Sequence, residues 1–160
     1  MSIFVKFEGI DGDATEDGHK KWIAVDSFQF GVGRGISTPV GDAARRETSK
    51  PSISEVVFTK RMDAASLKLW ESSLVENKGK KVEVHFTRTG DSGKLDVYAQ
   101  YELTNSLISG YSVSSGGESP SESVSLNFTK VMYKWVGAGA DNTDGSGGSN
   151  TFDLASAKMG

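Results

Sequence analysis

The side chains that most often carry catalysis are scarce in this chain, which has two histidines and no cysteine. Without cysteine there is no thiolate nucleophile, no disulfide and no thiolate metal site. His19 lies in a turn rich in Gly and Asp, and His85 lies on the polar side of a predicted strand. No Gly-x-Ser-x-Gly motif accompanies them. We therefore expect both histidines to be structural, predict no catalytic residues, and predict that the protein is not an enzyme.

Two segments resemble ligand-binding loops only in composition. Residues 11–18 are rich in Asp, but glycine is absent at the sixth position, and Trp22 stands at the twelfth, where a calcium loop needs a bidentate Glu. Residues 31–35 contain three glycines, but no helix is predicted after them to present its N-terminus to a phosphate. We therefore predict no metal site and no cofactor.

The overall composition excludes several classes of partner. The chain has 160 residues with 18 basic and 21 acidic side chains, so it lacks the excess of positive charge that nucleic-acid binding requires. The N-terminus has no apolar signal-peptide core, and no stretch approaches the roughly 18 apolar residues of a membrane helix. We expect a cytoplasmically synthesised protein, without signal peptide or membrane insertion, that binds no nucleic acid.

Period-two alternation of apolar and polar residues dominates the chain and predicts half-buried strands. Residues 82–88 and 95–103 both alternate and flank a turn-forming segment at 89–93, so they are expected to form a hairpin. This strand content predicts a mainly β barrel or sandwich. Further strands are predicted at about residues 3–8, 22–32, 56–61, 106–114 and 123–136.

The alternation changes parity within two of these strands. The changes fall near Asp26–Ser27 and near Thr129–Lys130. A β-bulge adds one residue and exchanges the two faces of a strand, so we predict a bulge at each place. The alternative is that both faces of these strands are covered, one by the core and one by a partner.

One segment has helical rather than strand periodicity. Asp63 is placed to cap its start, and Gly79 follows its end. We predict an amphipathic helix over residues 63–77 whose apolar face packs on one end or side of the β structure. The apolar positions are Ala64, Leu67, Trp70 and Leu74.

Two segments lack either periodicity. Residues 34–52 form a loop that is unusually long for a compact domain, and loops of this length are commonly functional. The mixed charges and apolar residues of this loop suggest docking on another surface. Residues 137–150 consist largely of small and polar residues and are predicted to be a flexible connector. With no catalytic residues predicted, self-association fits this organisation.

Four short motifs resemble, in order, the Hcp family, the haemolysin-coregulated tube proteins of bacterial type VI secretion systems. The resemblance spans residues 3–158. The motifs are Phe-Val-Lys-Phe-Glu-Gly-Ile-Asp-Gly-Asp at 4–13, Ser-Phe-Gln-Phe-Gly at 27–31, Phe-Thr-Lys-Arg-Met-Asp at 58–63 and Ser-Leu-Asn-Phe-Thr-Lys at 125–130.

The resemblance implies a single domain over residues 1–160: an Hcp-like β-barrel of two sheets with one flanking α-helix and a long extended loop. It also implies hexameric rings that stack into a tube, inside a contractile sheath and beneath a VgrG-type spike protein. The tube would hold effector proteins in its lumen and act as their chaperone. The tube would be exported by the secretion machinery into a target cell.

The resemblance also assigns roles to particular residues. Gln29, between two aromatic residues, is expected to face the lumen and contact effectors. The extended loop is expected to reach neighbouring subunits or rings. Residues 151–154 are expected to form an edge strand. The inter-subunit loop residues are Gly41, Asp42, Arg45, Arg46, Glu47 and Thr48.

A second hypothesis is a monomeric ligand-binding β-sandwich, such as a carbohydrate-binding-like module. It predicts that Trp22, Tyr98 and Trp135 gather on one solvent-exposed face. A tube protein instead predicts a ring, with Tyr98 as an interface anchor, because aromatic residues are enriched at such contacts.

Overall fold

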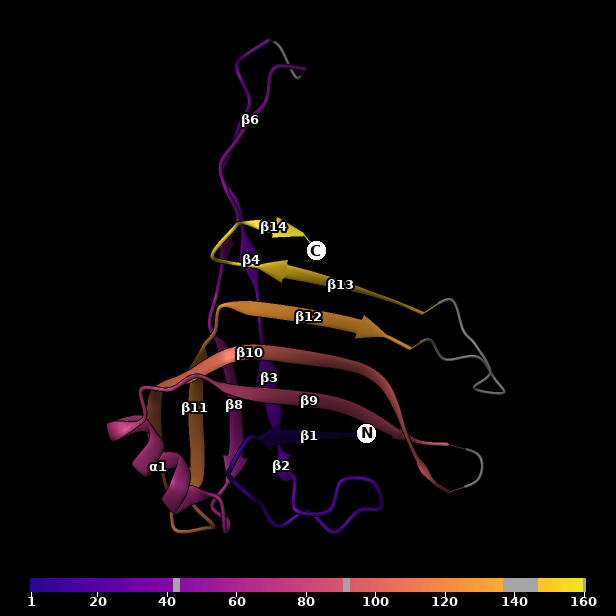
Figure 1. Ribbon diagram of the computed structural model, residues 1–160, viewed down its shortest axis with the longest axis vertical. Helices are drawn as coiled ribbons and strands as arrows, with labels where there is room; N and C mark the ends of the chain where they lie inside the picture. Colours follow the sequence, from indigo (N-terminus) through magenta and orange to yellow (C-terminus); the bar gives the residue numbers. More distant parts are fainter. Residues whose placement is uncertain (42–43, 91–92, 137–146, 160) are drawn as a thin grey trace.

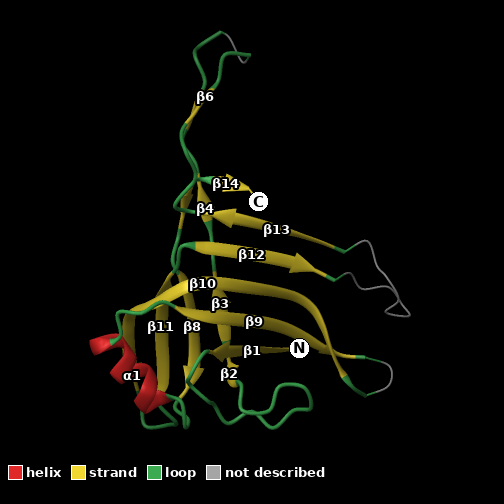
Figure 2. Ribbon diagram, in the orientation of Figure 1, coloured by secondary structure: helices red, strands yellow, loops and turns green. Residues whose placement is uncertain are grey.

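The structure, a computed structural model, describes residues 1–41, 44–90, 93–136 and 147–159. Antiparallel strands dominate it, and its only helix among the described residues flanks them (Figures 1 and 2). The mainly β class with one flanking helix is therefore confirmed. The strands form a branched ten-stranded sheet that folds into two layers.

The first layer contains the predicted hairpin. Residues 82–88 and 95–103 pair antiparallel, as the alternation and the intervening turn indicated. Residues 148–153 form a strand that pairs with residues 130–135 on one side and with one short strand on the other. The segment predicted as the edge strand is therefore the second strand from the edge of the layer. In order, the layer contains β2 (Ile23–Val25), β1 (Ser2–Phe7), β9 (Lys80–Thr89), β10 (Leu95–Ser114), β12 (Lys130–Trp135), β13 (Gly148–Asp153) and β14 (Lys158–Met159).

The second layer is joined to the first by the long strand β10. The first part of β10 pairs with β9 and β12, whereas residues 107–114 pair with β11. The register of β10 shifts at three places, between residues 97 and 99, 103 and 106, and 108 and 110. Such irregularities bend a strand, and here they accompany its passage between layers. The other strands of this layer are β11 (Ser121–Asn127), β8 (Val56–Arg61) and β3 (Ser27–Gln29).

The two parity changes mark layer changes, so the predicted bulges at these places are wrong. Asp26 separates β2, which pairs with β1, from β3, which pairs with β8. Residues 128 and 129 separate β11 from β12. When a chain leaves one layer and enters the other, the side chains that face the core change from odd to even positions or the reverse. A bulge causes the same change, so both produce the same change of parity in the sequence.

The hydrophobic core lies between the layers. Val5 and Val84 from the first layer and Phe58 and Leu126 from the second are fully buried. Phe4 is also buried, although neighbouring residues of a strand point to opposite faces. The outer face of β1 is therefore covered at Phe4, on which His19 from the loop between β1 and β2 stacks.

The helix α1 (Ser66–Val75) is shorter than the predicted 63–77. Asp63 does not cap it, because Ala65 occupies the N-cap position and Asp63 accepts a hydrogen bond from the Ala65 amide in the preceding turn. At the other end the backbone becomes extended at Glu76, before the glycine that was expected to end the helix.

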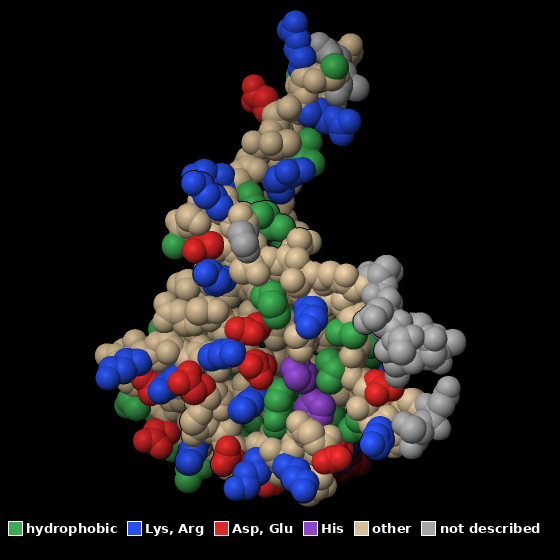
Figure 3. Space-filling view, turned by 45° about the vertical axis from the view of Figure 1, so that its right-hand side comes forward, with side chains coloured by type: hydrophobic (Ala, Val, Ile, Leu, Met, Phe, Trp, Pro, Cys, Tyr) green, Lys and Arg blue, Asp and Glu red, His purple; other side chains and the backbone are tan. Residues whose placement is uncertain are grey.

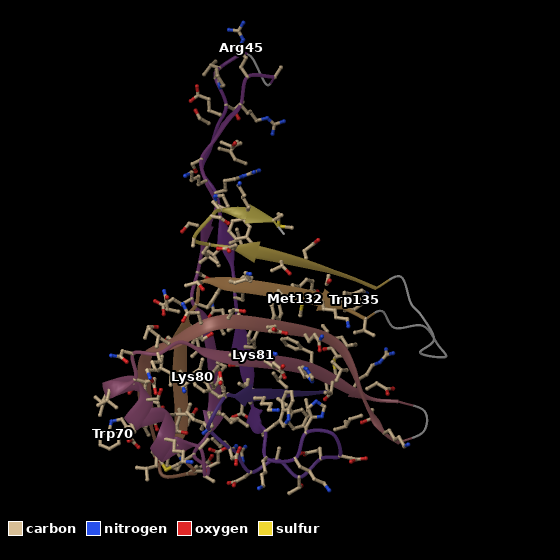
Figure 4. All side chains as sticks on the ribbon, in the orientation of Figure 1. Arg45, Trp70, Lys80, Lys81, Met132 and Trp135 are labelled. Carbon is tan, nitrogen blue, oxygen red and sulfur yellow. The ribbon has the colours of Figure 1, made fainter. Side chains whose placement is uncertain are left out.

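The apolar stripe of α1 faces outward, so the predicted packing of this stripe on the β structure is wrong. Leu67, Trp70 and Leu74 are 70%, 51% and 65% exposed. Leu69 and Ala65, on another side of the helix, are the buried apolar residues. Figure 4 shows Trp70 on the outer side of α1. Periodicity identified the stripe, but it cannot tell whether a stripe meets its own sheet or remains on the surface.

A buried ion pair fixes the start of α1 against the second layer. Lys60 and Glu122 face each other across β8 and β11, with their Nζ and Oε1 atoms 2.5 Å apart and both side chains buried. The Ser66 hydroxyl donates to the same Glu122 oxygen at 2.6 Å, and the Tyr111 hydroxyl donates to the other. The carboxylate is thus satisfied by partners from three elements.

Candidate functional site

A two-stranded ribbon projects from the body of the molecule along its longest axis (Figure 1). It occupies the segment predicted as the extended loop. Two short antiparallel pairs support it: β4 (Val32–Gly33) with β7 (Ser52–Ile53), and β5 (Ile36–Ser37) with β6 (Glu47–Thr48). Isolated two-stranded ribbons are marginally stable, so this arm needs support along its length.

Two serines add hydrogen bonds between the ribbon's strands, one on the body side of the β4–β7 pair and one between the two pairs. The Ser54 hydroxyl accepts a hydrogen bond from the Gly31 amide at 2.8 Å, and the Ser54 amide donates to the Gly31 carbonyl at 2.9 Å. Ser49 and Gly35 make the same two contacts further out, at 2.8 and 2.9 Å. A side chain at position 35 would crowd the Ser49 hydroxyl, which accounts for glycine there.

The outer end of the ribbon carries the predicted inter-subunit residues. Gly41, Arg45, Arg46, Glu47 and Thr48 are all exposed there, and Figure 4 places Arg45 at the tip. Gly41 has a φ of +83°, a backbone conformation that favours glycine. Figure 3 shows Lys and Arg side chains gathered along this arm. Asp42 lies outside the described residues.

An apolar groove lies at the base of the ribbon. Its volume is about 230 Å³, and it is lined by residues of the ribbon, β12, β13 and β14. Val32 and Met159, both in its lining, are more than half exposed. Exposed apolar surface of this kind is typical of contact with another macromolecule.

Gln29 lies on β3 at the outer side of the second layer. Its side chain is exposed, whereas Phe28 and Phe30, on either side of it, are half-buried. Phe28 packs against Tyr101, with ring centroids 5.1 Å apart, and Phe30 also contacts Tyr101, at 5.5 Å. The aromatic residues thereby fix the direction in which Gln29 points. Gln29 lies on β3 in the body of the molecule, whereas the ribbon tip projects away from it, so the predicted sites form two distinct surfaces.

The three aromatic residues predicted to form a binding platform do not gather on one face. Tyr98 and Trp135 contact each other, with ring centroids 5.9 Å apart. Trp22 instead packs on His85, at 4.5 Å, while Tyr98 contacts Phe86. Because consecutive β9 residues point to opposite faces, Trp22 lies on the other side of the sheet from Tyr98. This geometry counts against the carbohydrate-binding-like module.

The two histidines meet, which the sequence did not indicate because 66 positions separate them. His19 Nε2 and His85 Nδ1 are 3.0 Å apart, within hydrogen-bond distance. His19 is 4% exposed, and its ring stacks on Phe4 with the ring centroids 4.8 Å apart. The other nitrogen of His19, Nδ1, is buried and has no hydrogen-bond partner among the described residues. Figure 3 shows the two rings side by side.

Burial lowers the pKa of both histidines below the ordinary value. For His85, the charge of His19 lowers the pKa further, while the Glu83 carboxylate opposes the shift. For His19, interactions with the Asp17 backbone and with the Glu16 carboxylate oppose the lowering of the pKa. The neutral form of the pair is therefore favoured near neutral pH.

The described residues contain no group of three or more Asp, Glu or His side chains placed to hold a metal ion. They also contain no helix that is long and apolar enough to cross a membrane.

Comparison with known proteins identifies relatives of this fold. The family model described as "Type VI secretion system effector, Hcp" matches residues 4–135. A solved structure described as a type six secretion system protein is 26% identical, with a TM-score of 0.88 and 99% of both chains covered. No curated protein matches the sequence.

Two further solved structures share the fold at lower identity. Hcp1 from Salmonella typhimurium is 22% identical, with a TM-score of 0.77, 99% of this chain and 97% of that chain covered. A type VI secretion system effector from Yersinia pestis is also 22% identical, with a TM-score of 0.74 and coverages of 94% and 98%.

Proposed function

The chain belongs to the Hcp family of type VI secretion system proteins, and we propose from this that it is a structural component of the secretion tube. In this role it assembles as hexameric rings, and the rings stack into the expelled inner tube. The observation that carries the proposal is the family match over residues 4–135, joined to a structural likeness that covers 99% of the chain.

The projecting ribbon supports the assembly part of the proposal. Ring and stack formation require each subunit to offer two different complementary surfaces. The ribbon tip, with Arg45 and Arg46, is one candidate, because it stands far from the body and carries charge. The apolar groove at its base is a second candidate, and Tyr98 and Trp135 provide partly exposed aromatic rings for an interface.

In the assembled tube, Gln29 faces the lumen and contacts effector proteins that the tube carries. Its exposed, uncharged side chain suits transient contact with varied cargo. The outer partners are the contractile sheath and a VgrG-type spike. The chain folds as a single Hcp-like domain, is made in the bacterial cytoplasm, and is exported by the type VI machinery. Its task is structural rather than catalytic.

Native mass spectrometry with negative-stain electron microscopy tests this proposal. We expect a mass of six subunits and annular particles from the purified protein at micromolar concentration. A monomer with no annular particles under these conditions would contradict the ring and reopen the ligand-binding module. That module makes a separate prediction, which is saturable binding of oligosaccharides by the monomer in calorimetry.

A further inference from the structure

We propose that His19 and His85 form a pH-sensitive latch that holds residues 8–22 against the outer face of β1 and β9, and that opens when both rings carry a proton. The proposal does not depend on ring assembly. It rests on the placement of two residues that the structural role of the fold leaves unexplained.

The segment that the latch holds is a small ordered loop. The Gly12 amide donates to the Lys21 carbonyl at 2.8 Å, and the Ala14 amide donates to the Trp22 carbonyl at 3.0 Å. A Cβ at position 12 would lie 2.5 Å from the Trp22 carbonyl oxygen, so the two arms of the loop are in close contact. The loop thus moves as a unit when its attachment to the body changes.

Few polar contacts attach this loop to the body. At its start, the Glu8 carboxylate accepts from the Lys81 amide at 2.9 Å, and Asp13 accepts from the Ala64 amide at 3.1 Å. At its far end the attachment is the His19–His85 hydrogen bond, with Trp22 packed on both rings. The stacking of His19 on Phe4 also holds this end, so loss of the hydrogen bond weakens the attachment next to β2 and leaves it to ring packing.

The number of protons bound by the two rings determines when the latch opens. In the neutral pair one ring nitrogen donates and the other accepts. A first proton leaves this bond intact, because an imidazolium still donates to a neutral imidazole. A second proton places N–H groups on both facing nitrogens, 3.0 Å apart, where neither accepts and the two positive charges repel.

The charged side chains around the two histidines favour or disfavour their protonation. From the loop, Glu16 favours protonation, and Lys20 and Lys21 are the cations next to His19 in the chain. From β1, Lys6 places its ammonium 6.0 Å from the Trp22 ring that contacts both histidines. These cations disfavour a doubly protonated pair.

On β9 and β10, the carboxylates near His85 are already engaged. Glu83 favours protonation of His85, but its carboxylate lies 3.2 Å from the Lys81 ammonium. Glu102, opposite Glu83, also contacts Lys81, at 3.5 Å. Gln100, opposite His85, is uncharged. Burial of the rings therefore outweighs the nearby acids, and the second proton binds below the ordinary histidine pKa.

Hydrogen exchange measured by mass spectrometry tests the latch. Protection of peptides covering residues 8–22 is followed from pH 7.5 to 4.5, after correction for the intrinsic pH dependence of exchange. We expect loop protection to fall as the pH decreases, by about tenfold per pH unit while the closed pair holds one proton and the open state holds two, and to level off once both rings are protonated. Peptides from β11 should keep their protection over the same range.

The matched variant is His85→Asn, which keeps a polar group near the Nδ1 position but takes up no proton. Its loop protection is expected to fall less over the same pH range, because only His19 remains to take up a proton and its protonated ring can still donate to the amide oxygen at position 85. Constant protection in the unmodified protein would overturn the proposal. An equal loss in His85→Asn would also overturn it, because the loss would then not require a second protonated ring.

Nuclear magnetic resonance of the unmodified protein gives a test that needs no variant. The chain has two histidines, so each ring carbon signal belongs to one member of the pair. We expect two coupled titration steps, with the lower step well below pH 6.5 and accompanied by shifts of the Gly12 and Ala14 amides. Two independent titrations near the ordinary value would contradict the latch.

Discussion

Lys60 and Glu122 form a buried ion pair whose effect on stability can be measured by removing one or both side chains. Replacing Lys60 alone with Met leaves a buried carboxylate without its cation. We expect this change to lower the free energy of unfolding by about 3–5 kcal/mol in urea titrations. The double variant Lys60→Met with Glu122→Leu should be more stable than the single variant, because the fully buried carboxylate is gone. Asp63, whose side chain is 14% exposed and lies 2.8 Å from Lys60, loses its cation in both variants and does not contribute to the difference.

The exposed pair Lys81–Glu83 provides the control for this experiment. Its nitrogen and oxygen are 3.2 Å apart, but the Lys81 side chain is 52% exposed. We expect Lys81→Met to change stability little, since solvent screens exposed pairs. Additive losses in the Lys60 and Glu122 double variant would show that the two buried side chains are not coupled.

Gln29 gives a prediction about cargo at the same scale. We expect Gln29→Glu to change the retention of co-expressed effector proteins, because a charge replaces a neutral side chain on an exposed surface. Ring size should not change, since Gln29 is exposed between two packed aromatic residues. Pull-down of effectors with the ring, alongside native mass spectrometry, measures both quantities. Unchanged retention would place the cargo surface elsewhere.

At the scale of elements, α1 offers a matched comparison of two leucines. Leu69 is fully buried, whereas Leu67 is 70% exposed. We expect Leu69→Ala to cost about 2–5 kcal/mol of unfolding free energy, because it leaves a cavity. Leu67→Ala should cost far less. Similar losses for both in urea unfolding of the dissociated subunit would contradict the observed orientation of the helix.

The ribbon gives the second prediction at this scale. Changing Arg45 and Arg46 to Glu should weaken ring or stack formation while circular dichroism of the β structure stays the same. The same charge change at Lys68 and Lys78, exposed on the body, is the control and should leave assembly unchanged. Tubes and rings that form equally well with the Arg45 and Arg46 variant would exclude the ribbon as an assembly element.

The elements also show which features a sequence can predict. Local signals were sufficient for the β9–β10 hairpin, because its alternation and its turn are contiguous in the chain. The orientation of α1 was missed, because its exposed stripe has the same period as a buried one. The projecting ribbon was expected as a long loop without its two strand pairs, since two-residue strands leave no periodic pattern.

The candidate sites follow the same rule. Gln29 and the ribbon residues were predicted from their resemblance to family motifs. The His19–His85 contact was missed, because it joins a loop to a distant strand, and no local pattern encodes such a pair. The same holds for Lys60 and Glu122, which lie 62 positions apart and meet only when β8 pairs with β11.

For the whole molecule, the histidine pair predicts how stability depends on pH. Both histidines have a folded-state pKa below the ordinary value, so the unfolded chain binds protons more readily in weak acid. The free energy of unfolding should therefore be fully retained above about pH 6.5 and fall as the pH decreases below it. Urea unfolding at pH 7.5 and 5.5 measures the loss. Replacing both histidines should reduce it, whereas an unchanged loss would assign it to carboxylates.

Strand β10 has a mechanical consequence for the molecule as a whole. One continuous segment of 20 residues supplies hydrogen bonds to β9 and β12 in one layer and to β11 in the other. A force that peels either layer away must pull on this shared strand and loads the other layer at the same time. We expect the stretched subunit to unfold in one step, with both layers lost together, rather than one layer at a time.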